Sequence, residues 1–129
     1  MADAVLDASA ILALVLEEPG AERVEALVPG GTASAVNLGE VVAKPRDLGM
    51  QQESVDEIVA EMQLQVHGHD LTAALAAGHL RPMTRSAGLS LAGRACLALA
   101  RTLRLPALTA DRGWLGVADA IGVRVELIR

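Results

Sequence analysis

The chain has 129 residues, 52% of them apolar, a net charge of −5, a single cysteine and a single aromatic residue, Trp114. This length suits one domain over residues 1–129, with a core built from Ala, Leu and Val. The acidic balance excludes a broad basic nucleic-acid surface, and one cysteine excludes a disulfide framework.

The sequence shows neither a membrane-spanning segment nor a secretory signal. No apolar run approaches the ~18 residues that a membrane span needs. The first residues, "MADAVLDASA", carry acids and no basic region, unlike a secretory signal. We therefore expect a cytoplasmic protein with no membrane association.

Short apolar runs alternate with helical patterns along the chain. The runs predict strands at 4–8, 32–36, 64–69, 106–110 and 123–128. The helical patterns fall at 10–18, 21–28, 37–44, 51–63, 70–80, 88–100 and 111–122. Because strands and helices alternate, we expect an α/β fold with a largely parallel sheet covered by helices on both faces.

Helix boundaries follow from capping residues and prolines. Ser9, Asp70 and Ser90 are predicted N-caps, and Pro45 is predicted to end or kink the helix that begins near Asn37. Three residues after Ser90, where an acid or amide often completes a capping box, the chain has Gly93. Gly is a poor helix former, so its presence there calls for an explanation.

Carboxylates gather where the predicted strands end. Asp7 ends the first strand, Asp111 follows the 106–110 strand, and Glu40 lies one turn after Asn37 on the helix that follows 32–36. Ligands of open parallel sheets bind at this edge. Each acid alone is more often a solvated surface group or a helix cap, with the two interpretations nearly balanced for Asp7. Three together would repel one another unless a hard cation such as Mg²⁺ or Mn²⁺ neutralised them. Such a site suits metal-assisted phosphodiester hydrolysis.

Four ordered segments resemble the motifs of PIN-domain ribonucleases, and the similarity is greatest to the VapC toxins of bacterial type II toxin–antitoxin pairs. The segments are "DASA" from Asp7, "SAVNLGE" from Ser34 to Glu40, "RPMTRSAGLSLAGRACLALA" from Arg81, and "LTADR" from Leu108 to Arg112. The resemblance implies a PIN domain, a Rossmann-like three-layer α/β/α sandwich. It also implies an RNA substrate, a Mg²⁺ or Mn²⁺ site, a homodimer and inhibition by a cognate VapB-like antitoxin.

The site residues of the family match residues of this chain, except at one position. Asp7, Glu40 and Asp111 match three catalytic, metal-binding acids of the family, and Ser9, Asn37 and Thr109 match polar residues that support them. The remaining acid of the family falls on Gly93. Two hypotheses follow, an endoribonuclease toxin with impaired activity and a weak or inactive PIN-fold module that still dimerises and binds antitoxin or RNA.

The other polar residues admit simpler interpretations. Arg85 and Arg112 could contact phosphate, although a solvated arginine is the simpler interpretation for each. His67 and His69 would point to the same side of a strand, where a surface pair is favoured over a metal clip. Trp114 is interpreted as a core anchor, and Cys96 as a buried, inert thiol.

Overall fold

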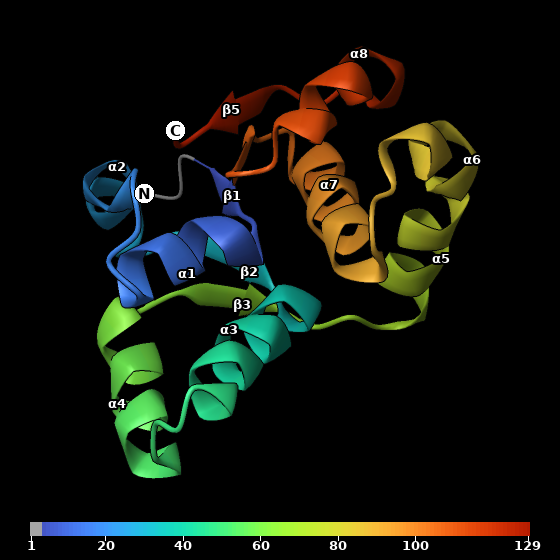
Figure 1. Cartoon of the computed structure of the whole chain (residues 1–129). Coiled ribbons are helices and arrows are strands. Elements are labelled where there is room, and N and C mark those ends of the chain that lie inside the picture. The colour runs from blue at the N-terminus through green and yellow to red at the C-terminus, as the bar shows by residue number, and fades with distance from the viewer. Residues whose placement is uncertain (1–3) are drawn as a thin grey trace.

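Five short strands alternate with helices in the computed structural model, which describes residues 4–129 (Figure 1). The strands are β1 (Val5–Leu6), β2 (Thr32–Ser34), β3 (Gln65–His67), β4 (Ala107–Thr109) and β5 (Val125–Leu127). The α-helices of the described residues are α1 (Ala8–Val15), α2 (Ala21–Leu27), α3 (Ala35–Asp47), α4 (Gln52–Met62), α5 (Leu71–His79), α6 (Arg81–Thr84), α7 (Leu91–Leu103) and α8 (Ala118–Ile121). Two 3₁₀ turns, η1 (Arg85–Ala87) and η2 (Arg112–Gly116), complete the element order.

The strands form one sheet in the order β3-β2-β1-β4-β5, and every neighbouring pair is parallel. Val5 of β1 is in register with Thr32 on one side and Ala107 on the other. The chain adds β2 and β3 on one side of β1 and then crosses to add β4 and β5 on the other. The strand order therefore reverses between β1 and β4, which is where such sheets bind ligands.

Helices cover both faces of the sheet, as the alternating pattern predicts. Side chains of successive strand residues point to opposite faces, so Leu6 and Leu108 join a core with α1 to α4, while Val5 and Ala107 join a second core with α5, α7 and α8. Figure 1 shows the two helical layers with the sheet between them. The three-layer α/β/α prediction is confirmed.

Several predicted boundaries are wrong by a few residues. The strands are shorter than predicted, and the region 111–122 divides into η2 and α8 instead of one helix. The segment 81–87 forms α6 and η1, for which no element was predicted. No helix within residues 4–129 combines the length and the apolar character needed to cross a membrane.

Two of the predicted helix signals are corrected. The N-cap position of α1 is Asp7 rather than Ser9, because β1 ends at Leu6; Asp7 makes no side-chain cap bond there, and the hydroxyl of Ser9 contacts Asp7 Oδ2 and Ala110 N instead. Pro45 does not end α3, which continues to Asp47. Pro45 lies in the last turn, where its missing N–H removes one bond, its ring is buried, and its carbonyl accepts from the N–H groups of Leu48 and Met50. Asp70 and Ser90 are confirmed as caps, because their side chains accept from Ala73 N and Gly93 N.

Candidate active site

Asp7 is the central buried polar group at the carboxyl edge of the sheet. It follows β1 directly and is only 7% exposed. The hydroxyls of Ser9 and Thr109 donate to its Oδ2 at 2.6 and 2.8 Å. Because β1 and β4 are neighbours, residues about a hundred positions apart in sequence hold one carboxylate in a fixed orientation.

Thr109 and Ser9 also fix the loop that carries the second predicted acid. The hydroxyl of Ser9 accepts from Ala110 N at 3.0 Å, and that of Thr109 accepts from Asp111 N at 3.1 Å. The carboxylate of Asp111 in turn accepts from Gly113 N at 2.9 Å and caps η2. The hydroxyls therefore couple the position of Asp7 to that of Asp111.

Asn37 ties Asp7 to two helices. It lies in the first turn of α3, is fully buried, and donates through Nδ2 to Asp7 Oδ1 at 3.2 Å and to the carbonyl of Ala92 at 3.1 Å. Its Oδ1 is buried and has no hydrogen-bond partner among the described residues. An acceptor in this position would normally be satisfied by a water molecule or another donor.

The electrostatics of the acids follow from this burial. Desolvation raises the pKa of Asp7, and the hydrogen bonds from Ser9 and Thr109 counteract part of that rise by stabilising the carboxylate. Burial also raises the pKa of Glu40, which lies on α3, and the negative charge of Asp7 raises it further. The two carboxylates are thus close enough to repel each other.

One pocket of about 300 Å³ contains all three predicted acids and the position of the expected fourth. Its lining consists of Asp7, Ala8, Ser9, Leu12, Glu40, Gly88, Leu89, Ser90, Gly93, Asp111 and Trp114. Asn37 and Thr109 lie behind this surface and orient the groups on it. The structure therefore brings together every predicted acid and each predicted supporting residue.

The start of α7 forms a largely apolar part of the pocket wall. Gly93 is buried in the first turn, and a Cβ there would lie 3.3 Å from Cζ2 of Trp114 and 3.4 Å from the side chain of Leu89. Trp114 is buried, as predicted for a core anchor, but it also faces this pocket. Leu89 and Ser90 could have been found from their proximity to Gly93 in sequence, whereas nothing in the sequence indicated Trp114.

Other predicted residues lie outside this pocket. Arg85 and Arg112 are exposed and do not line it, and Arg112 Nη2 donates to the carbonyl of Arg129 at 3.2 Å.

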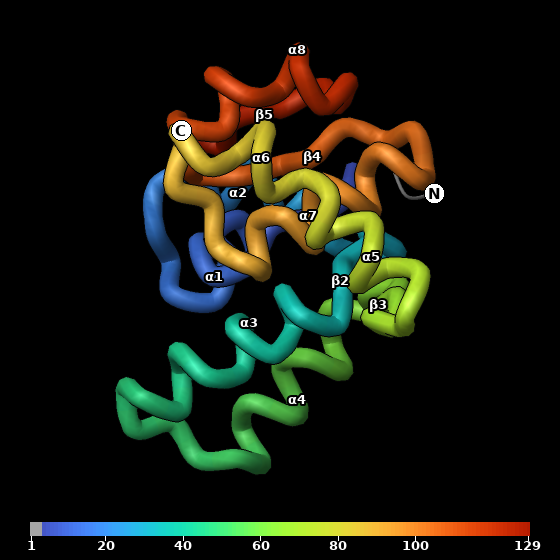
Figure 2. The backbone as a smooth tube through the Cα atoms, turned by 90° about the vertical axis from the view of Figure 1, so that its right-hand side faces the viewer, coloured from blue at the N-terminus to red at the C-terminus, as the bar shows by residue number. Residues whose placement is uncertain are grey.

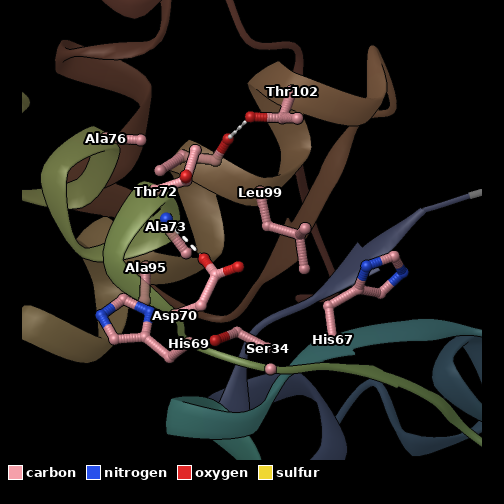
Figure 3. Close-up of a pocket in the computed structure, with 12 residues that line it drawn as sticks. Ser34, His67, His69, Asp70, Thr72, Ala73, Ala76, Ala95, Leu99 and Thr102 are labelled. Carbon is pink, nitrogen blue, oxygen red and sulfur yellow. Dashed lines mark hydrogen bonds between the residues drawn. The ribbon is translucent and has the colours of Figure 1, made fainter.

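The two histidines lie at a different pocket. β3 ends at His67, so His69 is not on the strand, and Figure 3 shows the two imidazoles directed to opposite sides of this separate pocket of about 330 Å³. The prediction that His67 and His69 share one side is wrong, because the strand is shorter than its apolar pattern. Cys96 is fully buried, as predicted.

The donor set fits a divalent cation that keeps open coordination positions. Within residues 4–129, no group of three or more Asp, Glu, His and Cys side chains could by itself hold a metal ion, so the acids do not form a closed cage. Mg²⁺ is usually held by one or two carboxylates and completes its coordination with water and substrate phosphate. The desolvated Asp7 and the neighbouring Glu40 provide that chemistry, with Asp111 on the same pocket.

Comparisons with known proteins place this architecture in a family. The chain is similar in structure to a toxin–antitoxin complex from Klebsiella pneumoniae, with 20% identity, 98% of each chain covered and a TM-score of 0.73. It is also similar to DNA-bound VapBC from Salmonella typhimurium (19% identity, 100% of each chain, TM-score 0.74) and to FitAcB from Neisseria gonorrhoeae (19% identity, 94% of each chain, TM-score 0.64). A comparison with curated proteins gives no match. The family model described as PIN domain matches residues 4–120, and the chain therefore belongs to the PIN domain family.

Proposed function

We propose that this chain is a VapC-like endoribonuclease toxin that uses Mg²⁺ or Mn²⁺ and is impaired by Gly93. PIN domains are generally nucleases, and the solved structures similar in fold include toxin–antitoxin complexes. The observation that carries the proposal is Asp7, buried at the strand-order reversal and hydrogen-bonded by Ser9, Asn37 and Thr109. Buried carboxylates of this kind are characteristic of sites that hold a cation or handle protons.

The residues divide the work of hydrolysis between them. Asp7 and Glu40 would hold the cation, and Asp111 would complete the acidic edge and orient water. A bound Mg²⁺ or Mn²⁺ supplies a Lewis acid for the scissile phosphate and lowers the pKa of an attacking water. Ser9, Asn37 and Thr109 position Asp7, so that its orientation requires no rearrangement when RNA binds.

We further propose the partners and setting that the family resemblance implies. The proposed unit is one PIN domain over residues 1–129, acting in the cytoplasm as a homodimer. A cognate VapB-like antitoxin would inhibit it. The similarity to VapBC and FitAcB folds supports this assignment, as do the motif residues retained at Asp7, Glu40 and Asp111.

Gly93 supports a second candidate, a PIN-fold module that binds antitoxin or RNA and cleaves weakly or not at all. Glycine has no side chain to act as ligand or base, and its neighbours Leu89 and Trp114 are apolar. The start of α7 therefore contributes no carboxylate to the pocket. Loss of a ligand at a metal centre reduces both metal affinity and rate.

The test compares RNA cleavage by purified wild type, Gly93→Asp and Asp7→Asn with Mn²⁺. We expect slow cleavage by wild type and a rate at least about tenfold higher for Gly93→Asp. We expect no cleavage by Asp7→Asn, or by any variant when a chelator is present. Equal rates for wild type and Gly93→Asp would refute impairment by Gly93. Cleavage that persists in Asp7→Asn would refute the site. No cleavage by any variant, with antitoxin binding retained, would favour the binding module.

A further inference from the structure

The pocket of about 330 Å³ that His67 and His69 border is not used by the proposed hydrolysis. It is formed where β3 ends, where α5 begins and along one side of α7, and it shares no lining residue with the acid pocket. Figure 2 shows the end of β3 next to α5. Ala76, Ala95 and Ala98 give it an apolar surface, to which a few polar side chains are added. This size and composition are typical of a site for a small organic ligand or for one group of a larger one.

The charges around this pocket exclude an anionic ligand group. Asp70 lines it, and no Lys or Arg is among the described residues that do so. A phosphate or carboxylate inside would face the carboxylate of Asp70 without a compensating cation, which is unfavourable. The group that enters must therefore be neutral or cationic.

Asp70 offers an acceptor that its own chain leaves unused. Its Oδ1 accepts from Ala73 N at 2.9 Å and caps α5, whereas no group within residues 4–129 donates to its Oδ2. Figure 3 shows this second oxygen directed into the pocket, toward Leu99. Both oxygens of a carboxylate accept hydrogen bonds, so Oδ2 is available to N–H groups of a ligand.

Ser34 supplies a buried donor to the same pocket. It ends β2, lines the pocket and is only 4% exposed. Its Oγ accepts from Val36 N at 3.2 Å, but in the described part of the chain its O–H donates to no acceptor. Because buried polar groups are normally hydrogen-bonded, this O–H is suited to a ligand acceptor.

We propose that this pocket receives a guanine base of single-stranded RNA, which Asp70 and Ser34 recognise. Guanine presents two adjacent donors, N1–H and N2–H₂, and the acceptor O6 on one edge. Oδ2 of Asp70 would accept from the donors and the hydroxyl of Ser34 would donate to O6, while the imidazoles of His67 and His69 provide rings on which a base can stack. Adenine and cytosine offer one exocyclic amino group each, and uracil offers one ring N–H. The proposal rests on the proposed function, because it names the base that the RNA nuclease reads.

The position of the pocket suits a base next to the phosphate that is cut. Ser34 is in register with His67, and the pairing of Val5 with Thr32 places Asp7 level with Ser34. Neighbouring strands lie about 4.8 Å apart, so the backbone at His67 is about 10 Å from the backbone at Asp7. An RNA strand with one phosphate at the acid pocket can therefore place a neighbouring base here and keep its other phosphates outside.

The first test titrates the full chain with guanosine, adenosine, cytidine and uridine in the presence of a chelator, and follows the backbone amide signals by NMR. Guanosine should bind at least about tenfold more tightly than the other nucleosides, with the largest shifts at Gly68, Asp70 and Ala73. Among pentanucleotides of uridine with one varied base, the guanine-containing one should bind most tightly. Since no metal is present, guanosine binding can succeed where RNA cleavage fails, and the reverse, so that failure of either proposal is seen separately.

The second test uses Asp70→Asn, which keeps an oxygen to accept from Ala73 N and so retains the helix cap. Its melting temperature should stay close to that of wild type, while its affinity for guanosine falls at least about tenfold. The matched control is Asp56→Asn, which removes the same charge from an exposed position on α4 and should leave guanosine binding unchanged.

Four outcomes would overturn the proposal. They are absence of guanosine binding, equal binding of all four nucleosides, shifts confined to residues outside this pocket, and unchanged guanosine affinity in Asp70→Asn. A free nucleotide is the other source of a guanine base. Binding of GTP more tightly than guanosine, with no preference for guanine among the pentanucleotides, would overturn RNA as the ligand in favour of the free nucleotide.

Discussion

The two walls of the acid pocket are built in opposite ways. On one wall, Asp7 is held by hydrogen bonds from the neighbouring Ser9 and from Asn37 and Thr109, which are distant in sequence. On the other, Gly93 offers no side chain, and Leu89 and Trp114 pack beside it. The difference shows that the hydrogen-bonded scaffold around Asp7 is complete although position 93 contributes no side chain, because the scaffold depends on contacts made by Ser9, Asn37 and Thr109.

The largest effect on the free energy of unfolding should come from truncating Asn37, which donates to Asp7. Asn37→Ala removes the hydrogen bonds of Nδ2 to Asp7 and to the Ala92 carbonyl and creates a cavity at a fully buried position. We expect the free energy of unfolding to fall by about 2–4 kcal/mol, measured by urea titration. Lys44→Ala, an exposed change on the same helix, should stay within about 0.5 kcal/mol of wild type. A similarly small change for Asn37→Ala would show that the hydrogen bonds of Asn37 contribute little to the stability of the fold.

A smaller loss is expected at Thr109. Thr109→Val keeps the side-chain volume but removes the donor to Asp7 and the acceptor for Asp111 N. The cost should be about 1–2 kcal/mol in the same titration. Thr102→Val on α7, where the hydroxyl contacts the Ala98 carbonyl at an exposed position, is the matched control and should cost less. Equal costs for the two variants would contradict the special role of Thr109.

Changes at Gly93 test the apolar wall directly. Gly93→Ala gains up to about 1 kcal/mol of helix propensity, which the 3.3 Å contact with Trp114 partly cancels. Gly93→Asp adds a negative charge to the pocket of Asp7, so without metal it should be less stable than Gly93→Ala by about 1 kcal/mol. Mn²⁺ should raise the melting temperature of Gly93→Asp more than that of Gly93→Ala or wild type. Trp114, the single tryptophan, gives a fluorescence readout of the same wall. A larger Mn²⁺ shift in the glycine form would refute this comparison.

The smallest effect expected is the pH dependence of the metal-free protein. The pKa of Asp7 is raised above its ordinary value of 3.8, so the folded state holds this proton more tightly than the unfolded state does. That contribution to stability is complete below pH 3.8 and is lost as pH rises through the raised pKa. It should be modest, because the hydrogen bonds of Asp7 oppose the effect of burial. Asp7→Asn should therefore gain stability relative to wild type as pH rises across this interval, measured by thermal melting without metal. A constant difference between the two proteins would contradict the assignment.

The acids of the pocket could be predicted from the sequence, whereas the apolar residues beside Gly93 could not. Asp7, Glu40 and Asp111 could be predicted to meet because each lies just after a predicted strand or at its end, and the α/β pattern places those strand ends at one edge of the sheet, whereas Thr109 was identified by the family resemblance. The apolar wall could not, since the approach of Trp114 to Gly93 depends on how η2 packs against the start of α7. Pro45 and His69 were misjudged for a local reason: a proline in the last turn and a residue just beyond a three-residue strand are governed by where the elements end.

Local sequence patterns were enough to predict the alternation of strands and helices, the caps at Asp70 and Ser90, and the position of Gly93 in the first turn of a helix. These are local properties, set by apolar periodicity and by side chains that reach their own backbone. Packing between distant elements sets the burial of Asp7 and its three side-chain hydrogen bonds, brings Leu89 and Trp114 into the same pocket, and leaves Leu71 and Leu75 of α5 exposed. Those outcomes depend on contacts between residues far apart in the chain, and apolar residues such as Leu71 and Leu75 look the same in sequence whether they are buried or exposed.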